Sequence, residues 1–183
     1  MSNMQNGVAV VALVGPDGCG KSTVLQDVAR ADPRSMPRQV QVAGRYATVM
    51  DLATPRGMVQ LVDFADAQTQ GTLMNASPPG SVILVVSAVD SLLPGHRDSL
   101  EQAGHRHIPL RAVVLTKVDM IEDEEMLDLV EMEIRELANK HRHQGDTMPI
   151  VRTRGPNARP HEGREPGPGK LIGPRALLSI LMQ

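Results

Sequence analysis

Short apolar runs separated by mixed segments dominate this chain. The longest run, residues 8–14 (VAVVALV), has no polar position and ends at a glycine. Similar runs occupy residues 58–62, 81–86, 111–115 and 148–151. A run without alternation is typical of a strand buried on both faces, as in a parallel sheet covered by helices. The pattern therefore predicts at least five strands of that kind.

Residues 45–50 (RYATVM) show a different pattern, in which apolar and polar positions alternate. Alternation is typical of a strand with one exposed face, and we expect an edge strand here. The turn residues Thr54, Pro55, Arg56 and Gly57 follow it and precede the run at 58–62. This order predicts a hairpin.

Helices are expected between these runs, and the clearest covers roughly residues 122–142. Acidic residues crowd its beginning and basic residues its end, as the helix dipole favours. We interpret this charge as the solvated face of a well-capped helix. Shorter helices are expected over residues 23–31 and 175–182. The apolar stripe of the long helix consists of Leu127, Val130, Ile134, Leu137 and Ala138.

Length and composition indicate one globular domain spanning residues 1–183. Hydrophobic residues make up 41% of the chain and charged residues 22%, which are ordinary globular values. Strands that alternate with helices predict an α/β fold: a doubly wound, mostly parallel six-stranded sheet with helices on both faces. Residues 153–170 are rich in glycine and proline and lack periodicity, so a mobile loop is expected there.

The charge balance and the single cysteine limit the classes of partner and compartment. The net charge is −2, so no global basic field would attract nucleic acid or an anionic membrane. No apolar run is long enough to span a bilayer. A single cysteine, Cys19, cannot form a disulfide within the chain, which agrees with a reducing compartment. We therefore expect a cytoplasmic protein that makes no membrane contact.

A glycine-rich segment directly after the first strand carries the strongest chemical signal. Residues 15–22 (GPDGCGKS) fit the phosphate-binding pattern G-x-x-x-x-G-K-[ST] between a buried strand and a helix. Backbone amides of such a loop surround phosphate oxygens, the lysine reaches the β and γ oxygens, and the hydroxyl ligates Mg²⁺. A small buried side chain filling the turn is the favoured role of Cys19. The expected phosphate-binding residues are Gly15, Asp17, Gly18, Cys19, Gly20, Lys21, Ser22 and Thr23.

Two further signals follow later strands. Thr116, Lys117 and Asp119 end the 111–115 run, where the Asp119 carboxylate is suited to accept hydrogen bonds from the guanine N1 and N2 groups. An alternative left open is that Asp119 caps the next helix. Asp63 ends the 58–62 run and is placed to support Mg²⁺ together with Ser22. We expect a Mg²⁺-dependent site for GDP or GTP.

With these elements in order, the chain resembles the guanine-nucleotide-binding domain of translational GTPases, most closely elongation factor Tu. The similarity is strongest in three segments: residues 81–100 (SVILVVSAVDSLLPGHRDSL), residues 111–141 (RAVVLTKVDMIEDEEMLDLVEMEIRELANKH) and residues 145–152 (GDTMPIVR). The resemblance implies a P-loop NTPase fold, a guanine nucleotide, Mg²⁺ and a two-state switch.

The chain departs from that family where the family senses and cleaves the γ-phosphate. Against the family pattern Asp-x-Pro-Gly-His, Asp66 replaces the glycine and Ala67 the histidine that orients water. The first switch, near residues 32–45, is shorter, and no threonine there matches the family's. Thr116 replaces an asparagine, and the loop that backs the guanine is not preserved at residues 153–155. The Pro-Gly-His of residues 94–96 follows the fourth strand, too late for this role, so His96 is expected in a loop.

The remaining histidines and the end of the chain bear on metal binding and on the partners that we expect. The His105–His107 and His141–His143 pairs lack acidic or cysteine partners at ligand spacing, so surface histidines are expected rather than a metal site. The chain stops where the family continues into two β-barrel domains, so no delivery of tRNA is expected. Two functions stay open: a small guanine-nucleotide switch or regulator with slow GTP hydrolysis, and a pseudo-GTPase module that recognises a protein partner by imitating the elongation factor's surface.

Overall fold

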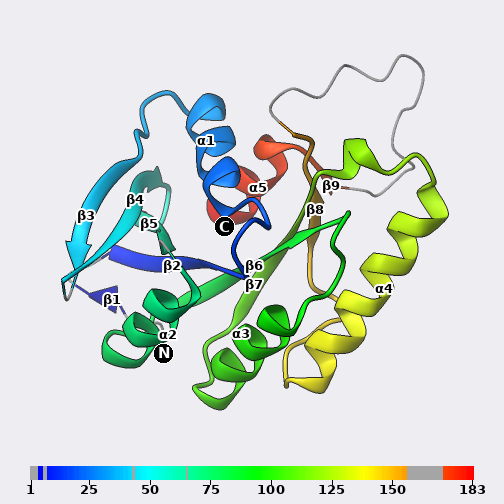
Figure 1. Ribbon diagram of the computed structural model, residues 1–183. Coiled ribbons are helices and arrows are strands. Elements are labelled where there is room, and N and C mark those ends of the chain that lie inside the picture. The colour runs from blue at the N-terminus through cyan, green and yellow to red at the C-terminus, as the bar shows by residue number, and fades with distance from the viewer. Residues whose placement is uncertain (1–3, 6–7, 43, 65, 156–170) are drawn as a thin grey trace.

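The computed structural model describes residues 4–5, 8–42, 44–64, 66–155 and 171–183. Within them, nine strands form one sheet, flanked by five α-helices and one 3₁₀-helix (Figure 1). The strands are β1 (Met4–Gln5), β2 (Val8–Val14), β3 (Arg38–Val42), β4 (Arg45–Thr54), β5 (Gly57–Phe64), β6 (Ser81–Ser87), β7 (Leu110–Thr116), β8 (Ile150–Arg152) and β9 (Leu171–Ile172). The helices are α1 (Lys21–Ala31), α2 (Ala67–Ala76), α3 (Pro94–His105), η1 (Val118–Met120), α4 (Glu124–Lys140) and α5 (Pro174–Leu181).

The sheet is mostly parallel, as the apolar runs predict. Its order is β3-β4-β5-β2-β6-β7-β8-β9, and β1 pairs separately with β2. All neighbours from β5 to β9 along this path are parallel, whereas β3, β4 and β5 are joined antiparallel. The order reverses at β2, which lies between β5 and β6. That reversal is the point at which open α/β sheets bind their ligands, beyond the carboxyl ends of the strands.

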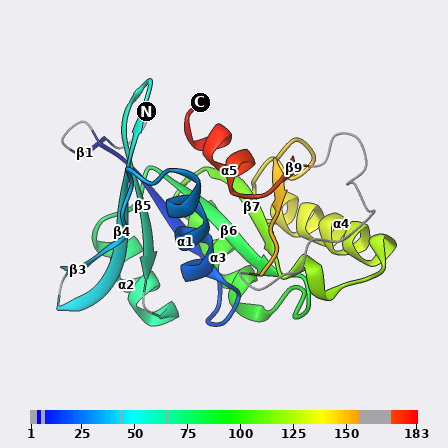
Figure 2. The same cartoon turned by 90° about the horizontal axis from the view of Figure 1, so that it is seen from above.

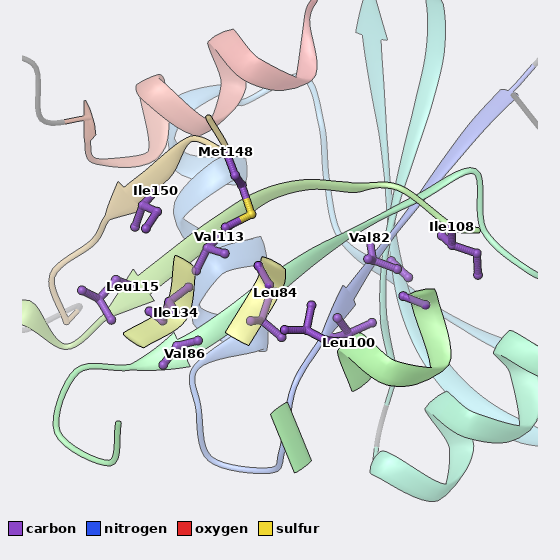
Figure 3. Packing of buried hydrophobic residues seen from close by; sticks show 14 of the residues in the cluster. Val82, Leu84, Val86, Leu100, Ile108, Val113, Leu115, Ile134, Met148 and Ile150 are labelled. Carbon is purple, nitrogen blue, oxygen red and sulfur yellow. The ribbon is translucent and has the colours of Figure 1, made fainter. Parts of the chain in front are cut away.

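Two apolar cores, one on each face of the sheet, explain the uninterrupted runs. Along β2, Ala12 and Val14 belong to one core, whereas Val11 and Leu13 belong to the other. Successive side chains of a strand point to opposite faces, so every position of a doubly covered strand is apolar. Helices α2, α3 and α4 contribute to the first core, part of which Figure 3 shows. Helices α1 and α5 cover the opposite face.

The six expected strands are present, and β1, β3 and β9 extend the sheet beyond them. Strands β1 and β9 have two residues each, too few to leave a pattern. The side chains of strand β3 are largely exposed, so its sequence has no apolar run that would predict it. It pairs outside β4, so the prediction that residues 45–50 form an edge strand was wrong. The predicted hairpin through residues 54–57 is confirmed.

The glycine- and proline-rich segment lies mostly outside the described residues, which omit 156–170. Its first part, residues 153–155, is described. Thr153 is buried, and its amide donates to the carbonyl of Leu115. Backbone hydrogen bonds thus hold the beginning of this segment against the end of β7.

Candidate functional site

The glycine-rich loop connects β2 to α1 at the carboxyl edge of the sheet, and close packing forces glycine at two of its positions. Gly15 and Gly20 have φ angles of +143° and +102°, which L side chains rarely adopt. A Cβ on Gly15 would lie 2.6 Å from the carbonyl oxygen of Val85. A Cβ on Gly20 would lie 3.2 Å from the side chain of Thr116. The loop therefore rests directly on β6 and β7.

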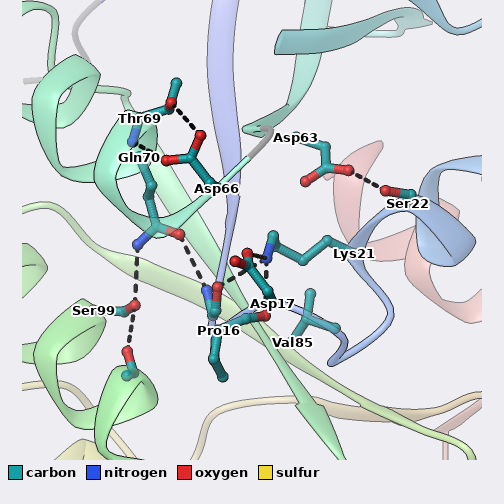
Figure 4. A network of polar contacts seen from close by, with 12 residues as sticks. Pro16, Asp17, Lys21, Ser22, Asp63, Asp66, Thr69, Gln70, Val85 and Ser99 are labelled. Atoms are coloured by element: carbon teal, nitrogen blue, oxygen red, sulfur yellow. Dashed lines mark hydrogen bonds and ion pairs between the residues drawn. The ribbon is translucent and has the colours of Figure 1, made fainter. Parts of the chain in front are cut away.

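Lys21 begins α1 and folds back over the loop. Its Nζ donates to the carbonyl oxygens of Gly15 and Pro16, both at 2.9 Å, and lies 3.8 Å from a carboxylate oxygen of Asp17. The side chain is buried. Figure 4 shows the ammonium group held above the backbone of the loop. The positive charge is thus placed where a phosphate chain would lie in a loop of this kind.

Ser22 and Asp63 meet across the gap between α1 and the end of β5. The Ser22 hydroxyl donates to Asp63 Oδ2 at 2.7 Å, whereas Asp63 Oδ1 is buried with no hydrogen-bond partner among the described residues. Burial raises the pKa of Asp63, and the bond from Ser22 opposes that rise. A hydroxyl and an unpaired carboxylate oxygen are hard donors of the type that Mg²⁺ takes. The pair therefore fits a Mg²⁺ site completed by phosphate oxygens and water.

A cleft of about 460 Å³ opens over these groups. One wall is the loop and the start of α1, and the other is formed by β3, β4 and β5. Thr48 of β4 pairs in register with Asp63 and lines the cleft, together with Tyr46 and Gln39. No pattern in the sequence marks these three residues as part of a site. Only the strand register places them at the site, and register is not visible in a single sequence.

The Thr116–Asp119 segment follows the end of β7 and contacts the glycine-rich loop through Thr116. The buried Thr116 hydroxyl donates to the carbonyl of Cys19 at 2.7 Å, which ties the end of β7 to the loop. Lys117 adopts a left-handed conformation with φ of 57°, and its Nζ lies 3.4 Å from Asp90. These contacts give the threonine a structural role, in which it holds the loop to β7.

Asp119 lies in η1, and its Oδ1 accepts a 2.7 Å hydrogen bond from the amide of Gly155. It does not cap the next helix: the N-cap of α4 is Asp123, whose side chain accepts from the amide of Glu125. The alternative explanation of Asp119 is therefore wrong. The contact with Gly155 joins the η1 segment to residues 153–155 at the carboxyl edge of β7 and β8.

Cys19 is buried in the loop, and its burial raises the pKa of the thiol. A raised pKa leaves the thiol protonated and poorly nucleophilic at neutral pH. The expectation that this side chain fills a tight turn is confirmed. Asp17 and Gly18, by contrast, are exposed at the tip of the loop and line the cleft.

Asp66 caps α2. Its carboxylate accepts from the amide and the hydroxyl of Thr69, at 2.7 and 2.8 Å. These bonds lower the pKa of Asp66, so the carboxylate stays ionised at neutral pH. The residue in place of the family's glycine thus presents a fixed negative charge at the start of the helix, directly after β5. The side chain of Ala67 is outside the described part of the chain.

A buried polar chain connects α2 and α3 to the loop, and no sequence pattern predicts it. Gln70 Oε1 accepts from the amide of Gly15 at 3.3 Å, and Gln70 Nε2 donates to the hydroxyl of Ser99 at 3.0 Å. Ser99 in turn donates to the carbonyl of Gly95 at 2.7 Å. Figure 4 shows this path from α2 to the base of the loop.

His96 is not a loop residue, and the expectation that it would be one was wrong. It lies in the first turn of α3 and is fully buried beneath the loop. Its Nδ1 accepts from the amide of Leu93 at 2.9 Å, so Nε2 carries the proton that it shares with the carbonyl of Val85 at 3.1 Å. Burial lowers the pKa of His96. The neutral imidazole packs close to Gly15, 3.6 Å from the position that a Cβ on this glycine would take.

The acidic run of the long helix is also more than a solvated face. Arg152 of β8 is 3% exposed and pairs with Asp128 at 2.7 Å, with Glu131 at 2.6 Å and with Glu124. These three positions share one side of α4, because residues three and four apart face the same way. The predicted solvated face is confirmed at residues 122–125, which are all exposed, and the ion pairs with Arg152 are what the charge pattern did not predict.

Among the described residues, the structure shows neither a cluster of metal ligands nor a membrane-spanning helix. No group of three or more His, Cys, Asp or Glu side chains there is arranged to hold a metal ion. None of the described helices combines the length and the apolar character needed to cross a lipid bilayer.

The comparison with known families agrees with this geometry. The chain matches the family model for the elongation factor Tu GTP-binding domain over residues 61–162, which is more than half of its 183 residues. The matched region begins in β5 and includes Asp63, the α2 cap, and the Thr116–Asp119 segment. The glycine-rich loop precedes it. This chain therefore belongs to the elongation factor Tu GTP-binding domain family.

Proposed function

We propose that this protein binds a guanine nucleotide with Mg²⁺ in the cleft and hydrolyses GTP slowly or not at all, acting as a small switch or regulator. The observation that supports nucleotide and Mg²⁺ binding is the buried Asp63 carboxylate. Its Oδ1 has no hydrogen-bond partner among the described residues, and its Oδ2 accepts from the Ser22 hydroxyl at 2.7 Å. A buried carboxylate oxygen without a partner is costly unless a cation or water completes it.

The phosphate groups would bind along the loop from Gly15 to Thr23. Gly18 and Gly20 have positive φ angles, and a glycine-rich turn of this kind directs successive amides toward an anion. Lys21 would exchange its contacts with loop carbonyls for phosphate oxygens. Ser22 and Asp63 would hold Mg²⁺, which supplies charge neutralisation at the β and γ oxygens.

The base would bind between Lys117 and Asp119. One oxygen of Asp119 is engaged by Gly155, and the carboxylate keeps its second oxygen for the guanine N1 and N2 donors. Adenine lacks that donor pair. Thr116 contributes by fixing the loop to β7 rather than by contacting the base.

Slow hydrolysis follows from the two replaced positions after β5. Ala67 has no group able to orient a water molecule, and Asp66 holds an ionised carboxylate directly after β5, three residues beyond Asp63. Catalysis would then depend on Lys21 and Mg²⁺ alone, without a positioned nucleophile. A negative charge in that place also favours GDP over GTP.

The test is calorimetric titration of nucleotide-free protein with GDP, GTP and ATP in Mg²⁺, with phosphate release followed in the same samples. We expect guanine-specific binding, a preference for GDP, and little phosphate. Lys21→Met removes the charge in the loop and should abolish binding, whereas Lys140→Met, at the exposed end of α4, should not. Equal binding of ATP and GTP would contradict the assignment of Asp119.

A second candidate is an interaction module that needs no nucleotide. The observation that favours it is a row of exposed apolar side chains on α4, formed by Met126, Leu129 and Met132, each about half exposed. An exposed apolar row of this kind marks a surface for a protein partner. Under this function, a folded sample binds no nucleotide, and Lys21→Met leaves partner binding unchanged.

A further inference from the structure

A second cavity lies at the opposite end of the sheet from the phosphate cleft. It is lined by the first residues of the central strands, Ala9 and Val10 of β2, Ser81 of β6 and Arg111 of β7. The glycine-rich loop, by contrast, follows the carboxyl end of β2. Figure 2 shows the end of α5 and the β4–β5 turn on the same side of the molecule, near the start of these strands. The cavity measures about 840 Å³, which is larger than the phosphate cleft.

The walls of this cavity are mainly apolar. Val10, Pro109, Pro149, Leu171 and Ile180 contribute to them. Cavities of several hundred cubic ångströms with apolar walls and a few polar groups are the usual sites for small organic ligands. The polar groups here are the hydroxyl-bearing Ser81 and Ser179 and two arginines.

Both arginines line the cavity, and they come from different elements. Arg111 begins β7, and its Nη2 donates to the carbonyls of Ile180 and Leu181 at 3.0 and 3.1 Å, which fixes the guanidinium at the end of α5. Arg56 is exposed in the turn between β4 and β5, and its amide donates to Thr54 Oγ1, so the backbone of the turn is held independently of the guanidinium.

No carboxylate neutralises this pair within the described part of the chain. The residues that line the cavity include no Asp or Glu. They do include Gln183, but neither arginine forms an ion pair there with a side chain or with the terminal carboxylate of Gln183. Burial and the charge of Arg56 together lower the pKa of Arg111. Two guanidinium groups that repel each other across an apolar cavity are stabilised by an anion between them.

We propose that this cavity binds a small organic anion, in which an oxyanion head group, carboxylate or phosphate, is attached to an apolar body. The guanidinium of Arg56 offers a planar fork that matches two oxygens of the head group. Arg111, whose Nη2 is engaged by α5, adds its positive charge and its remaining N–H groups. The apolar body lies along Val10, Pro109, Pro149 and Ile180. This site is independent of the nucleotide: its ligand contacts the beginnings of the strands and leaves the glycine-rich loop free.

The test is titration of the full chain with octanoate and with octyl phosphate by calorimetry, with two-dimensional NMR to locate the contact. Octanol and acetate separate the contributions of charge and apolar body. Arg56→Gln removes one charge without touching the contacts of α5, and Arg97→Gln, an exposed arginine of α3, removes the same charge elsewhere. Ser179→Trp fills the cavity from α5 and leaves both arginines in place.

We expect at least one of the two amphiphilic anions to bind, with shifted amide signals at Gly80, Ser81 and Ser179. Arg56→Gln should weaken it by about fivefold, the upper range for a partly exposed ion pair, and Arg97→Gln should not. Ser179→Trp should abolish the binding. Octanol binding as tightly as octanoate, acetate binding as tightly as octanoate, or equal effects of the two arginine variants would each overturn the proposal.

Discussion

At the residue scale, one departure from the family, Asp66, has two roles that can be told apart. Its carboxylate both caps α2 and holds a negative charge where the family has a glycine amide. The two roles can be separated, because asparagine caps helices as well as aspartate does and carries no charge.

Asp66→Asn is therefore expected to raise the affinity for GTP relative to GDP, by about twofold to fivefold for an exposed charge. The helix should remain capped, so the free energy of unfolding should change little. Calorimetric titration with both nucleotides measures the ratio. Asp123→Asn, which alters the equivalent cap of α4, is the matched control. An unchanged ratio in a folded Asp66→Asn sample would refute the role given to this charge.

His96 makes a separate prediction about pH. Its pKa is lowered in the folded protein, so the unfolded chain binds a proton that the folded chain does not. Stability from this residue is present above the unfolded pKa of about 6.5 and is lost as the pH falls through the lower folded value. The nearby charges of Lys21 and Asp90 act in opposite directions on it.

The measurement is the free energy of unfolding between neutral and mildly acidic pH for the natural chain, His96→Asn and the control His107→Asn, at an exposed position. The His96 variant should lose part of the pH dependence, because asparagine does not titrate. The control should keep it. The pKa of His143 is lowered in the same direction, and its contribution stays in all three proteins. Equal slopes would show that His96 does not carry this dependence.

At the scale of elements, α2 is linked to the loop by Gln70 rather than by a backbone contact. The carboxamide accepts from Gly15 and donates to Ser99 of α3, so the three elements share one buried side chain. A change in the loop on nucleotide binding should therefore reach α2 through this group.

Gln70→Met keeps the volume of the side chain and removes both hydrogen bonds. We expect it to lower the free energy of unfolding by about 1–3 kcal/mol, because the Gly15 amide is left buried without a partner. In the natural chain, Mg²⁺ and GDP should slow amide exchange in α2, and this protection should be smaller in the variant. Hydrogen exchange measures it. Gln68→Met, exposed on the same helix, should behave like the natural chain.

The existence of the parallel strands was predictable from the sequence because they are apolar on both faces, as residues 8–14 and 81–86 are, whereas their order in the sheet was not. The glycine-rich loop was predictable because its chemistry requires fixed residue types. Strand β3 could not be predicted, since a largely exposed strand has no run of apolar residues. The burial of His96 could not be predicted from the sequence, and neither could the hydrogen bonds of Gln70 or the ion pairs of Arg152. Each of these features brings together segments that are far apart in the chain, and only the folded topology places such segments side by side.

At the scale of the whole molecule, the loop, β5 and β7 meet only in the folded state, so a nucleotide held by all three should stabilise the entire fold. A ligand at a hundred times its dissociation constant adds about 2.7 kcal/mol to the free energy of unfolding when the unfolded chain does not bind it. For a chain of this length that corresponds to a rise in Tm of about 5–10 °C.

Thermal unfolding with Mg²⁺ and GDP should show this rise, and ATP at the same concentration should give none if Asp119 selects the base. Lys21→Met should lose the rise, whereas Lys140→Met should keep it. In Asp63→Asn the rise should be smaller and independent of Mg²⁺, because the amide cannot replace the carboxylate as a ligand. A rise of equal size in the Lys21 variant would mean that GDP binds elsewhere, and the loop would then be a structural turn.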